Sequence, residues 1–269
     1  MATKKGKFLS GIIGLLKLSK RNEQQIVSTK PGKGKVNQTE ATKKASNTFG
    51  MASALSNNIK KVYDEYLDGT KDSQLTTRLG TRILDSIRPC RNNETGRYRF
   101  ERHSFKYLEG LDFNIESPLM RTLGFLTEVT YKDGLLNVKS MGENDLLKIK
   151  YPNKAKICDL IVSVALFKLS EGQYNFHPIT QMLELTLDNT ETGNLDMNFE
   201  VPNGCLCVAS IFLMSYHIYL GRYVRLNSRD FSPAGICGAY VTPGTFEGEE
   251  TGHWITHDPM KFDQEKIVK

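Results

Sequence analysis

Apolar positions are most continuous over residues 205–214, where odd and even positions alike are largely apolar, so that both faces of a strand would be buried. The turn signal Pro202-Asn203-Gly204 precedes this run, and the β-branched and aromatic residues within it favour a strand over a helix. A strand that continued to residue 227 would be unusually long. We therefore predict a central strand, followed by a bend or hairpin near His217 or Gly221.

Alternation with a period of two indicates further strands. Residues 125–131 and 135–140 flank Asp133-Gly134, a strong hairpin signal. Residues 183–187 and 195–201 alternate as two half-buried antiparallel strands. Residues 157–169 are mostly apolar and fit a buried helix or a strand; the length of the run favours the helix.

Helical spacing dominates before residue 90. One apolar stripe runs from about Asn47 to Leu67, and a second covers residues 75–87 before Pro89. Because the apolar faces of the strands need a covering layer, the pattern predicts an α+β fold with a mainly antiparallel sheet packed against two or three helices. We expect residues 47–269 to form one globular domain, preceded by a disordered basic arm over residues 1–46.

Charge separates the arm from the body. The net charge of +6 is divided into +9 for residues 1–46 and −3 for the remainder. A basic arm on a nearly neutral body indicates a polyanionic partner, either a phosphate backbone or an anionic lipid surface. A merely solubilising tail is the alternative.

The first 21 residues predict a short basic amphipathic helix that lies on a membrane surface, since the apolar run is too short to span one. A signal peptide is a competing interpretation, but no small-x-small cleavage site follows the run. Docking of the apolar side onto the body or onto a second copy is another. The candidate residues for membrane or polyanion binding are Lys4, Lys5, Lys7, Phe8, Leu9, Ile12, Ile13, Leu16, Lys17, Lys20 and Arg21.

Residues 22–46 have no periodic apolar pattern and predict a flexible linker. The basic pairs Lys20-Arg21 and Lys43-Lys44 leave open whether host nuclear import machinery binds the arm.

A second basic region, residues 88–106, interleaves arginines with aromatic residues. Such a mixture can bind nucleic acid by pairing phosphates and stacking bases, and it fits an exposed edge strand equally well. The candidate residues for nucleic acid or nucleocapsid binding are Arg91, Arg97, Arg99 and Arg102.

Signatures of catalysis or metal binding are missing from the sequence. The five cysteines lack framework spacing, so we expect reduced thiols, with Cys205 and Cys207 in the core. His217 is expected to be a hydrogen-bonded core residue, and His253 and His257 lie beside Asp258-Pro259, which favours a loop over a metal-binding helix. We find no nucleophile elbow and no dinucleotide fingerprint. The sequence therefore predicts a protein that is not an enzyme and needs no cofactor.

The apolar strand and the residues after it resemble the C-terminal half of rhabdovirus matrix proteins, through His217-Ile218, Gly221-Arg222, Val224 and Leu226-Asn227. The lysine-rich amphipathic start and flexible linker are also similar to that family, most of all to its plant-infecting, nucleus-replicating members. The resemblance implies a viral structural protein that self-associates, condenses the viral ribonucleoprotein and links it to the anionic inner face of the envelope. It implies a location in the virion, in the host nucleus and cytoplasm, and peripherally on membranes. Pro-Pro-x-Tyr and Pro-Thr/Ser-Ala-Pro budding motifs are missing, so recruitment of budding machinery is not implied.

Two other classes fit parts of the chain. A plant-virus movement protein of the 30K type also has an apolar strand before a basic turn, but Leu187-Asp188-Asn189-Thr190 lacks the arginine expected in that family. A cellular RNA-binding module would rest on residues 91–105 alone.

Overall fold

The computed structural model describes residues 3–21, 24–29, 39–67, 69–186, 193–246 and 253–265. The chain divides into two compact units, Met1–Ser46 and Asn47–Lys269. This division falls where the strongly basic composition of the first 46 residues gives way to the nearly neutral remainder.

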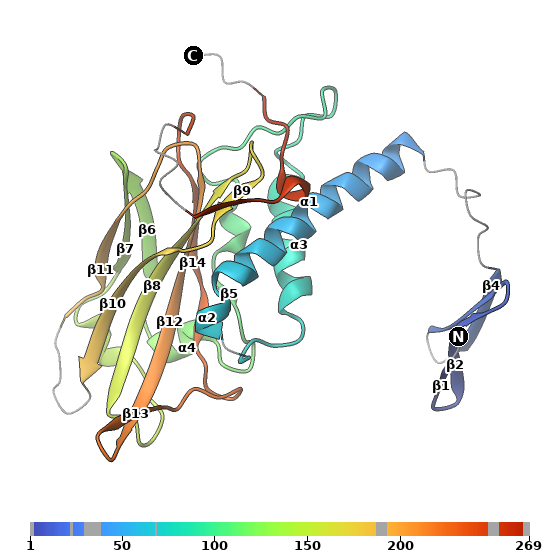
Figure 1. Ribbon diagram of the computed structural model, residues 1–269. Coiled ribbons are helices and arrows are strands. Elements are labelled where there is room, and N and C mark those ends of the chain that lie inside the picture. The colour runs from blue at the N-terminus through green and yellow to red at the C-terminus, as the bar shows by residue number, and fades with distance from the viewer. Residues whose placement is uncertain are drawn as a thin grey trace. The chain divides into compact units, whose positions relative to one another are not determined.

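An eight-stranded antiparallel sheet forms the middle layer of the second unit (Figure 1). The strands follow the order β15-β9-β8-β12-β14-β5, with β10 also paired to β8 and β13 to β12. The strands are β5 (Leu111–Asp112), β8 (Ile157–Lys168), β9 (Gln173–Asn175), β10 (Ile179–Thr186), β12 (Leu206–Tyr219), β13 (Arg222–Arg225), β14 (Ala234–Val241) and β15 (Trp254–Thr256).

The prediction of a central strand is confirmed by β12, which pairs with β8 on one side and β14 on the other. Its even positions, such as Leu206 and Phe212, face the helices, whereas its odd positions, such as Cys207 and Ile211, face a second sheet. Both faces are therefore buried, as a run without alternation requires. The predicted hairpin is also present, since β12 turns at Leu220-Gly221 into β13.

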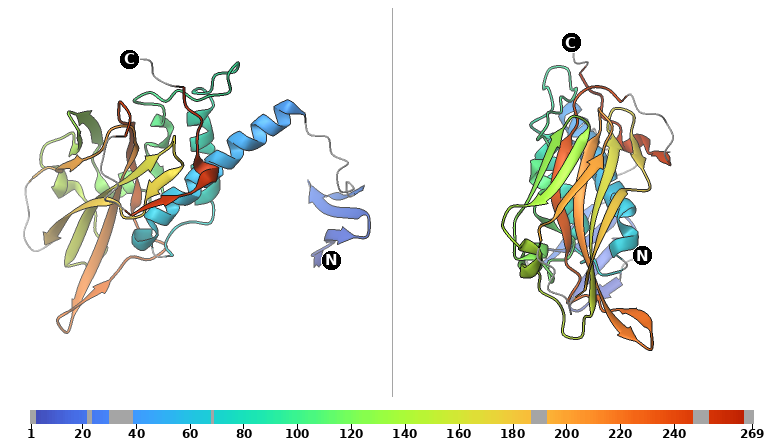
Figure 2. Two further views of the ribbon diagram at one scale, coloured as in Figure 1. Left: turned by 45° about the horizontal axis from the view of Figure 1, so that its top comes forward. Right: turned by 90° about the vertical axis from the view of Figure 1, so that its left-hand side faces the viewer.

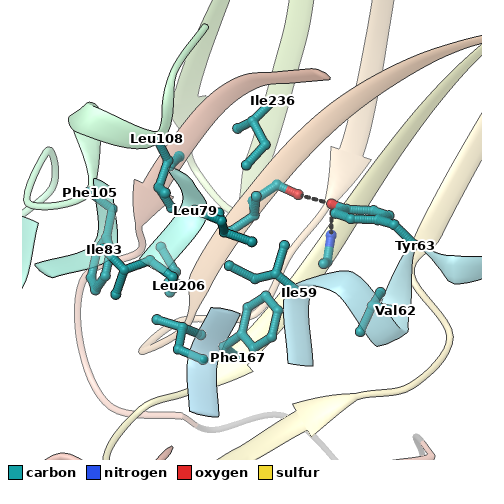
Figure 3. Packing of buried hydrophobic residues seen from close by; sticks show 14 of the residues in the cluster. Ile59, Val62, Tyr63, Leu79, Ile83, Phe105, Leu108, Phe167, Leu206 and Ile236 are labelled. Carbon is teal, nitrogen blue, oxygen red and sulfur yellow. Dashed lines mark hydrogen bonds between the residues drawn. The ribbon is translucent and has the colours of Figure 1, made fainter. Parts of the chain in front are cut away.

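Helices cover one face of this sheet (Figures 1 and 2). Ile59 of α1 and Leu79 and Ile83 of α3 pack with Phe167 and Leu206 of the sheet (Figure 3). The helix predicted over residues 75–87 is confirmed, while α1 begins seven residues before the predicted start of order at Asn47. The helices are α1 (Glu40–Val62), α2 (Asp64–Leu67), α3 (Leu75–Ile87) and α4 (Leu119–Leu123).

A three-stranded sheet of order β11-β7-β6 covers the opposite face. Its strands are β6 (Thr127–Lys132), β7 (Leu135–Ser140) and β11 (Asp196–Glu200). The Asp133-Gly134 hairpin is confirmed, with φ angles of 52° and 84° as a type I′ turn requires. The two sheets approach so closely that a Cβ atom on Gly238 would lie 2.5 Å from Cγ2 of Val129.

Two points about the body that the sequence left open are decided by the structure. Residues 157–168 form the strand β8 and not a helix, because β10 and β12 pair with its two edges and bury its side chains on both faces. Period alone does not separate these states for a continuous apolar run. The strands predicted near residues 183–187 and 195–201 are present as β10 and β11, and each pairs antiparallel with a different partner: β10 joins β8, and β11 joins β7 in the other sheet.

The first unit also differs from the prediction. Four antiparallel strands, β1 (Thr3–Lys5), β2 (Phe8–Ile13), β3 (Leu16–Arg21) and β4 (Gln24–Thr29), replace the amphipathic helix and the first part of the flexible linker. Gly14, with a φ of 58°, opens the two-residue turn between β2 and β3, while glycine disfavours a helix interior. The β-branched Ile12, Ile13 and Val27 favour strands. Residues 30–38 of the predicted linker lie outside the described residues.

The α+β class with a mainly antiparallel sheet is thus confirmed. A buried tyrosine joins two of its layers. The hydroxyl of Tyr63, next to the end of α1, donates a hydrogen bond to the Val208 carbonyl and accepts one of 3.2 Å from the Ala165 amide (Figure 3). Val208 and Ala165 are partners in the β12–β8 register, so the hydroxyl bonds to both strands at the same pair of residues. Burial raises the pKa of Tyr63 well above its ordinary value.

Replacing Tyr63 by phenylalanine is expected to lower the free energy of unfolding by about 1–3 kcal/mol, because a buried amide and a buried carbonyl lose their partner. Urea unfolding of the full chain measures the change. The matched variant Tyr66→Phe loses only an exposed hydrogen bond of 3.2 Å to Thr180 and should change stability by less than about 0.5 kcal/mol. Equal losses in both variants would contradict this role for Tyr63.

Candidate functional site

The turn between β2 and β3 and the residues next to it are all apolar. We call residues 12–16 the arm tip. Ile13 pairs with Leu16 across the turn, and Ile12 pairs with Lys17. The exposed fractions are 77% for Leu15, 53% for Ile13, 43% for Leu16 and 39% for Ile12. None of the five residues carries a polar side chain. Contiguous exposed apolar side chains of this kind are typical of an interaction surface.

Basic residues lie on both sides of the arm tip in the sequence. Residues 1–21 contain six lysines and arginines and no aspartate or glutamate. Lys17 and Lys20 lie on β3, directly after the tip, and both are exposed. The ammonium of Lys20 lies 4.7 Å from the centre of the Phe8 ring. Lys7 is exposed in the turn between β1 and β2.

The candidate arm residues therefore keep the chemistry predicted for them but are arranged differently. Instead of apolar and basic sides of one helix, the chain has an apolar turn that joins the uncharged strand β2 to the basic strand β3. Lys4 and Lys5 pair with Leu9 and Phe8 between β1 and β2, and Arg21 ends β3. Among the side chains that the structure describes in this small sheet, Leu18 is the buried one, at 9% exposure.

A basic cleft lies on the second unit, at the loops between α3 and β5. Its volume is about 740 Å³. The cationic side chains that line it are those of Arg91, Arg99, Arg102 and Lys106, with His103 beside them, and the carboxylates are those of Glu101 and Glu265. The cleft therefore carries a positive net charge. Arg102 also lines a neighbouring cavity of about 670 Å³ with Tyr131 and Lys132, so the two hollows adjoin.

Three of the four predicted arginines meet in this cleft. Arg99 approaches Glu101 at 3.9 Å, and Arg102 lies 5.6 Å from the Tyr240 ring centre. Arg91 donates hydrogen bonds of 3.4 Å to the Gly96 carbonyl and to Thr48 Oγ1. Arg97 instead pairs with Asp263 at 3.4 Å and does not line the cleft.

Both earlier interpretations of this region need correction. It forms no edge strand, because its ladder contacts are the isolated bridges of Tyr98 with Arg91 and Gln264. Tyr98 and Phe105 are buried, and Phe100 packs against the same core, so these rings are not available to stack bases. The candidate residues chosen from the sequence did not include Lys106, which ends the basic stretch, or the exposed Tyr107, which directly follows it.

The remaining candidate groups for chemistry are dispersed. Cys205 and Cys207 are buried core residues, as predicted, and all five thiols are free. Burial raises the pKa of Cys158, Cys205 and Cys237 to about 12, so these thiols are protonated at neutral pH. Within the described residues no three His, Cys, Asp or Glu side chains converge on a metal position.

The histidines do not form a joint site. His253 contacts His177, with ring centres 4.8 Å apart, whereas His257 Nδ1 lies 2.9 Å from the amide nitrogen of Asn58. His217, expected in the core, is only half-buried on the β12–β13 hairpin, where Nδ1 lies 3.1 Å from the Lys154 carbonyl.

Comparison of the chain with protein-family models, with curated proteins and with solved structures finds no match. In the described parts of the chain, no helix combines the length and the apolar character that crossing a bilayer requires. The candidate surfaces are thus the arm tip with its flanking cations and the basic cleft.

Proposed function

We propose that this chain is a non-enzymatic matrix-type protein that attaches to an anionic membrane surface through its N-terminal unit. The observation that carries the proposal is the arm tip: exposed apolar residues at a turn, next to strands that contain lysines and no carboxylate. Apolar side chains at a tip enter the boundary between headgroups and acyl chains, while the lysines remain at the phosphates.

The charge of the arm and the burial of its apolar tip each contribute to the free energy of membrane binding. Each lysine or arginine near an anionic surface contributes about 1 kcal/mol, and burial of apolar area contributes about 25 cal/mol per Å². Stable anchoring of a peripheral protein takes two such signals together. The arm supplies both within residues 1–21.

The resemblance to rhabdovirus matrix proteins supplies the rest of the proposal. The chain would self-associate and bind the viral ribonucleoprotein, and so join it to the inner face of the envelope. The basic cleft supports the second of these roles, because four cationic side chains in a hollow can pair with phosphates.

The same cleft favours a second candidate function, binding of single-stranded RNA without a membrane. Exposed Tyr107 next to Lys106 offers a ring for stacking. A cellular RNA-binding module or a 30K-type movement protein would act in this way. The segment 187–190 that bears on the movement proteins lies outside the described residues.

Replacing Ile13 and Leu15 together by serine tests the proposal. The double variant should bind phosphatidylserine-containing vesicles about tenfold more weakly in a sedimentation titration. Complete burial of a leucine or isoleucine contributes about 1.5–3 kcal/mol, and partial burial of the two side chains at the headgroup boundary leaves a sum of about 1.4 kcal/mol, which is a factor of ten. The control Leu126→Ser removes a body side chain of 62% exposure and should leave binding unchanged. Unchanged binding by the double variant would contradict the assignment of the arm tip.

A further inference from the structure

The β12–β13 hairpin extends beyond the central sheet (Figures 1 and 2). The pairing of β12 with β8 ends at Tyr216 opposite Ile157, whereas its pairing with β13 continues through Tyr219 opposite Arg222. At about 3.4 Å per residue, Leu220 lies roughly 14 Å beyond the last residue of β12 that β8 supports. We call residues 217–224 the body tip.

Leu220 occupies a turn position whose backbone conformation is unfavourable for leucine. Leu220 has a φ of 49° and Gly221 a φ of 73°, so both central positions lie in the left-handed region. Such a type I′ turn favours asparagine or glycine first, and a leucine there is strained. The Leu220 side chain is also 85% exposed and therefore gains little from packing within the protein. Backbone strain that no packing contact within the protein offsets is typical of residues that have a functional role, such as binding a partner.

Apolar side chains occupy both faces of the body tip. Ile218 pairs with Tyr223 on one face, and His217 and Val224 pair on the other. The exposed fractions are 44% for Ile218, 62% for Tyr219, 64% for Tyr223 and 46% for Val224. A protein partner docked on one face would leave the other face in water. A lipid boundary, with acyl chains at the turn and headgroups along the strands, contacts both faces at once.

The charged residues of the hairpin segment itself are of one sign. Residues 215–229 contain Arg222, Arg225 and Arg229 and no carboxylate. Carboxylates of neighbouring segments adjoin it: Asp159 and Glu184 line a small pocket with Tyr216 and Tyr223, and Glu116 pairs with Arg229 at 2.9 Å. Tyrosines below an aliphatic tip, with arginines beside them, have the arrangement of residues that lie at the boundary between lipid and water.

We infer that the body tip is a second lipid-binding element, which inserts Leu220 and Tyr219 into an anionic bilayer and places Arg222 at the headgroups. The inference deepens the proposed membrane attachment and rests on it. It assigns lipid contact to the body as well as to the N-terminal unit. Since two linked contacts raise the effective concentration of each other, the chain would bind vesicles more tightly than either tip does alone.

The variant Leu220→Asn tests this inference in the full chain. Asparagine suits the first position of a type I′ turn, so thermal stability should stay unchanged or rise while the apolar tip is lost. Binding to phosphatidylserine-containing vesicles should weaken about fivefold or more. A variant that binds vesicles as the wild type does would overturn the inference.

The variant Tyr219→Trp reports the environment of the body tip directly. Its emission, taken as the difference from the wild type with Trp254 alone, should shift to the blue on anionic vesicles and be quenched by brominated lipid. An unshifted emission on bound vesicles would overturn the inference. A loss of self-association by Leu220→Asn without a loss of vesicle binding would also overturn it, because the hairpin would then contact another copy.

The two tips fail in distinguishable ways. If Ile13→Ser/Leu15→Ser weakens vesicle binding while Leu220→Asn does not, membrane attachment through the arm stands and the body tip is excluded. If Leu220→Asn alone weakens binding, the body tip stands and the arm assignment fails. If the wild type does not bind vesicles, both fail.

Discussion

Replacing Lys7, Lys17 and Lys20 together by glutamine is expected to weaken binding to anionic vesicles by about 100-fold. Each of these exposed lysines contributes about 1 kcal/mol near an anionic surface, and no carboxylate within residues 1–21 offsets their charge. Because a factor of ten corresponds to about 1.4 kcal/mol, the loss of about 3 kcal/mol predicts the stated change. Sedimentation titration with phosphatidylserine-containing vesicles measures it.

The control for this prediction separates local charge from net charge. Lys61, Lys132 and Lys150 are exposed lysines of the second unit, and their replacement by glutamine removes the same total charge. That variant should bind vesicles within a fewfold of the wild type. An equally large loss in the control would show that total charge, and not the arm, decides binding.

The second large effect concerns the basic cleft. Replacing Arg99, Arg102 and Lys106 by alanine should lower the affinity for single-stranded RNA by about 10- to 100-fold, because phosphate contacts dominate such binding. The dependence of log affinity on log salt should flatten by about 2, since each phosphate contact with a single strand contributes about 0.7. Fluorescence anisotropy with a labelled oligonucleotide at several salt concentrations measures both quantities.

A matched variant locates this effect. Arg97, Arg121 and Arg229 are exposed arginines that do not line the cleft, and two of them make surface ion pairs with Asp263 and Glu116. Their replacement by alanine removes the same charge and little stability. If both triple variants lose RNA affinity equally, the cleft is not the binding surface.

Local sequence signals were sufficient to predict an element where the residues allow only one backbone conformation. Asp133-Gly134 occupies a type I′ turn, and the apolar run at 205–214 forms a strand buried on both faces. The limits of α3 could be read from its apolar stripe and Pro89. In each case a turn, a strand buried on two faces or a helix terminator restricts the chain to one conformation.

Other elements depend on contacts that no local pattern contains. Several apolar residues of 157–168 would share one face of a helix, yet the segment forms a strand because β10 and β12 pair with its two edges. Residues 8–16 fit a helical wheel, but Gly14 forms a turn and the arm becomes a sheet. The wheel put these apolar residues on one side of a helix, whereas successive residues of the strand β2 point to opposite faces of the sheet.

The candidate surfaces were only partly predicted, because they too depend on contacts between distant segments. The arm residues could be recognised from composition, because exposed apolar and basic residues keep their chemistry in either conformation. The cleft joins Arg91, Arg99 and Arg102 with Lys106 through loops, and buries Tyr98 and Phe105 beneath them. Alternation along the sequence does not reveal which aromatic rings fill a core.

Vesicle flotation of the full chain tests the central claim most directly, with anionic and neutral vesicles compared at about 0.1 M and about 0.5 M salt. The predicted result is flotation with anionic vesicles that decreases at the higher salt, and little flotation with neutral vesicles. Equal flotation with both kinds of vesicle at both salt concentrations, or none with either, would contradict attachment through a basic arm with an apolar tip.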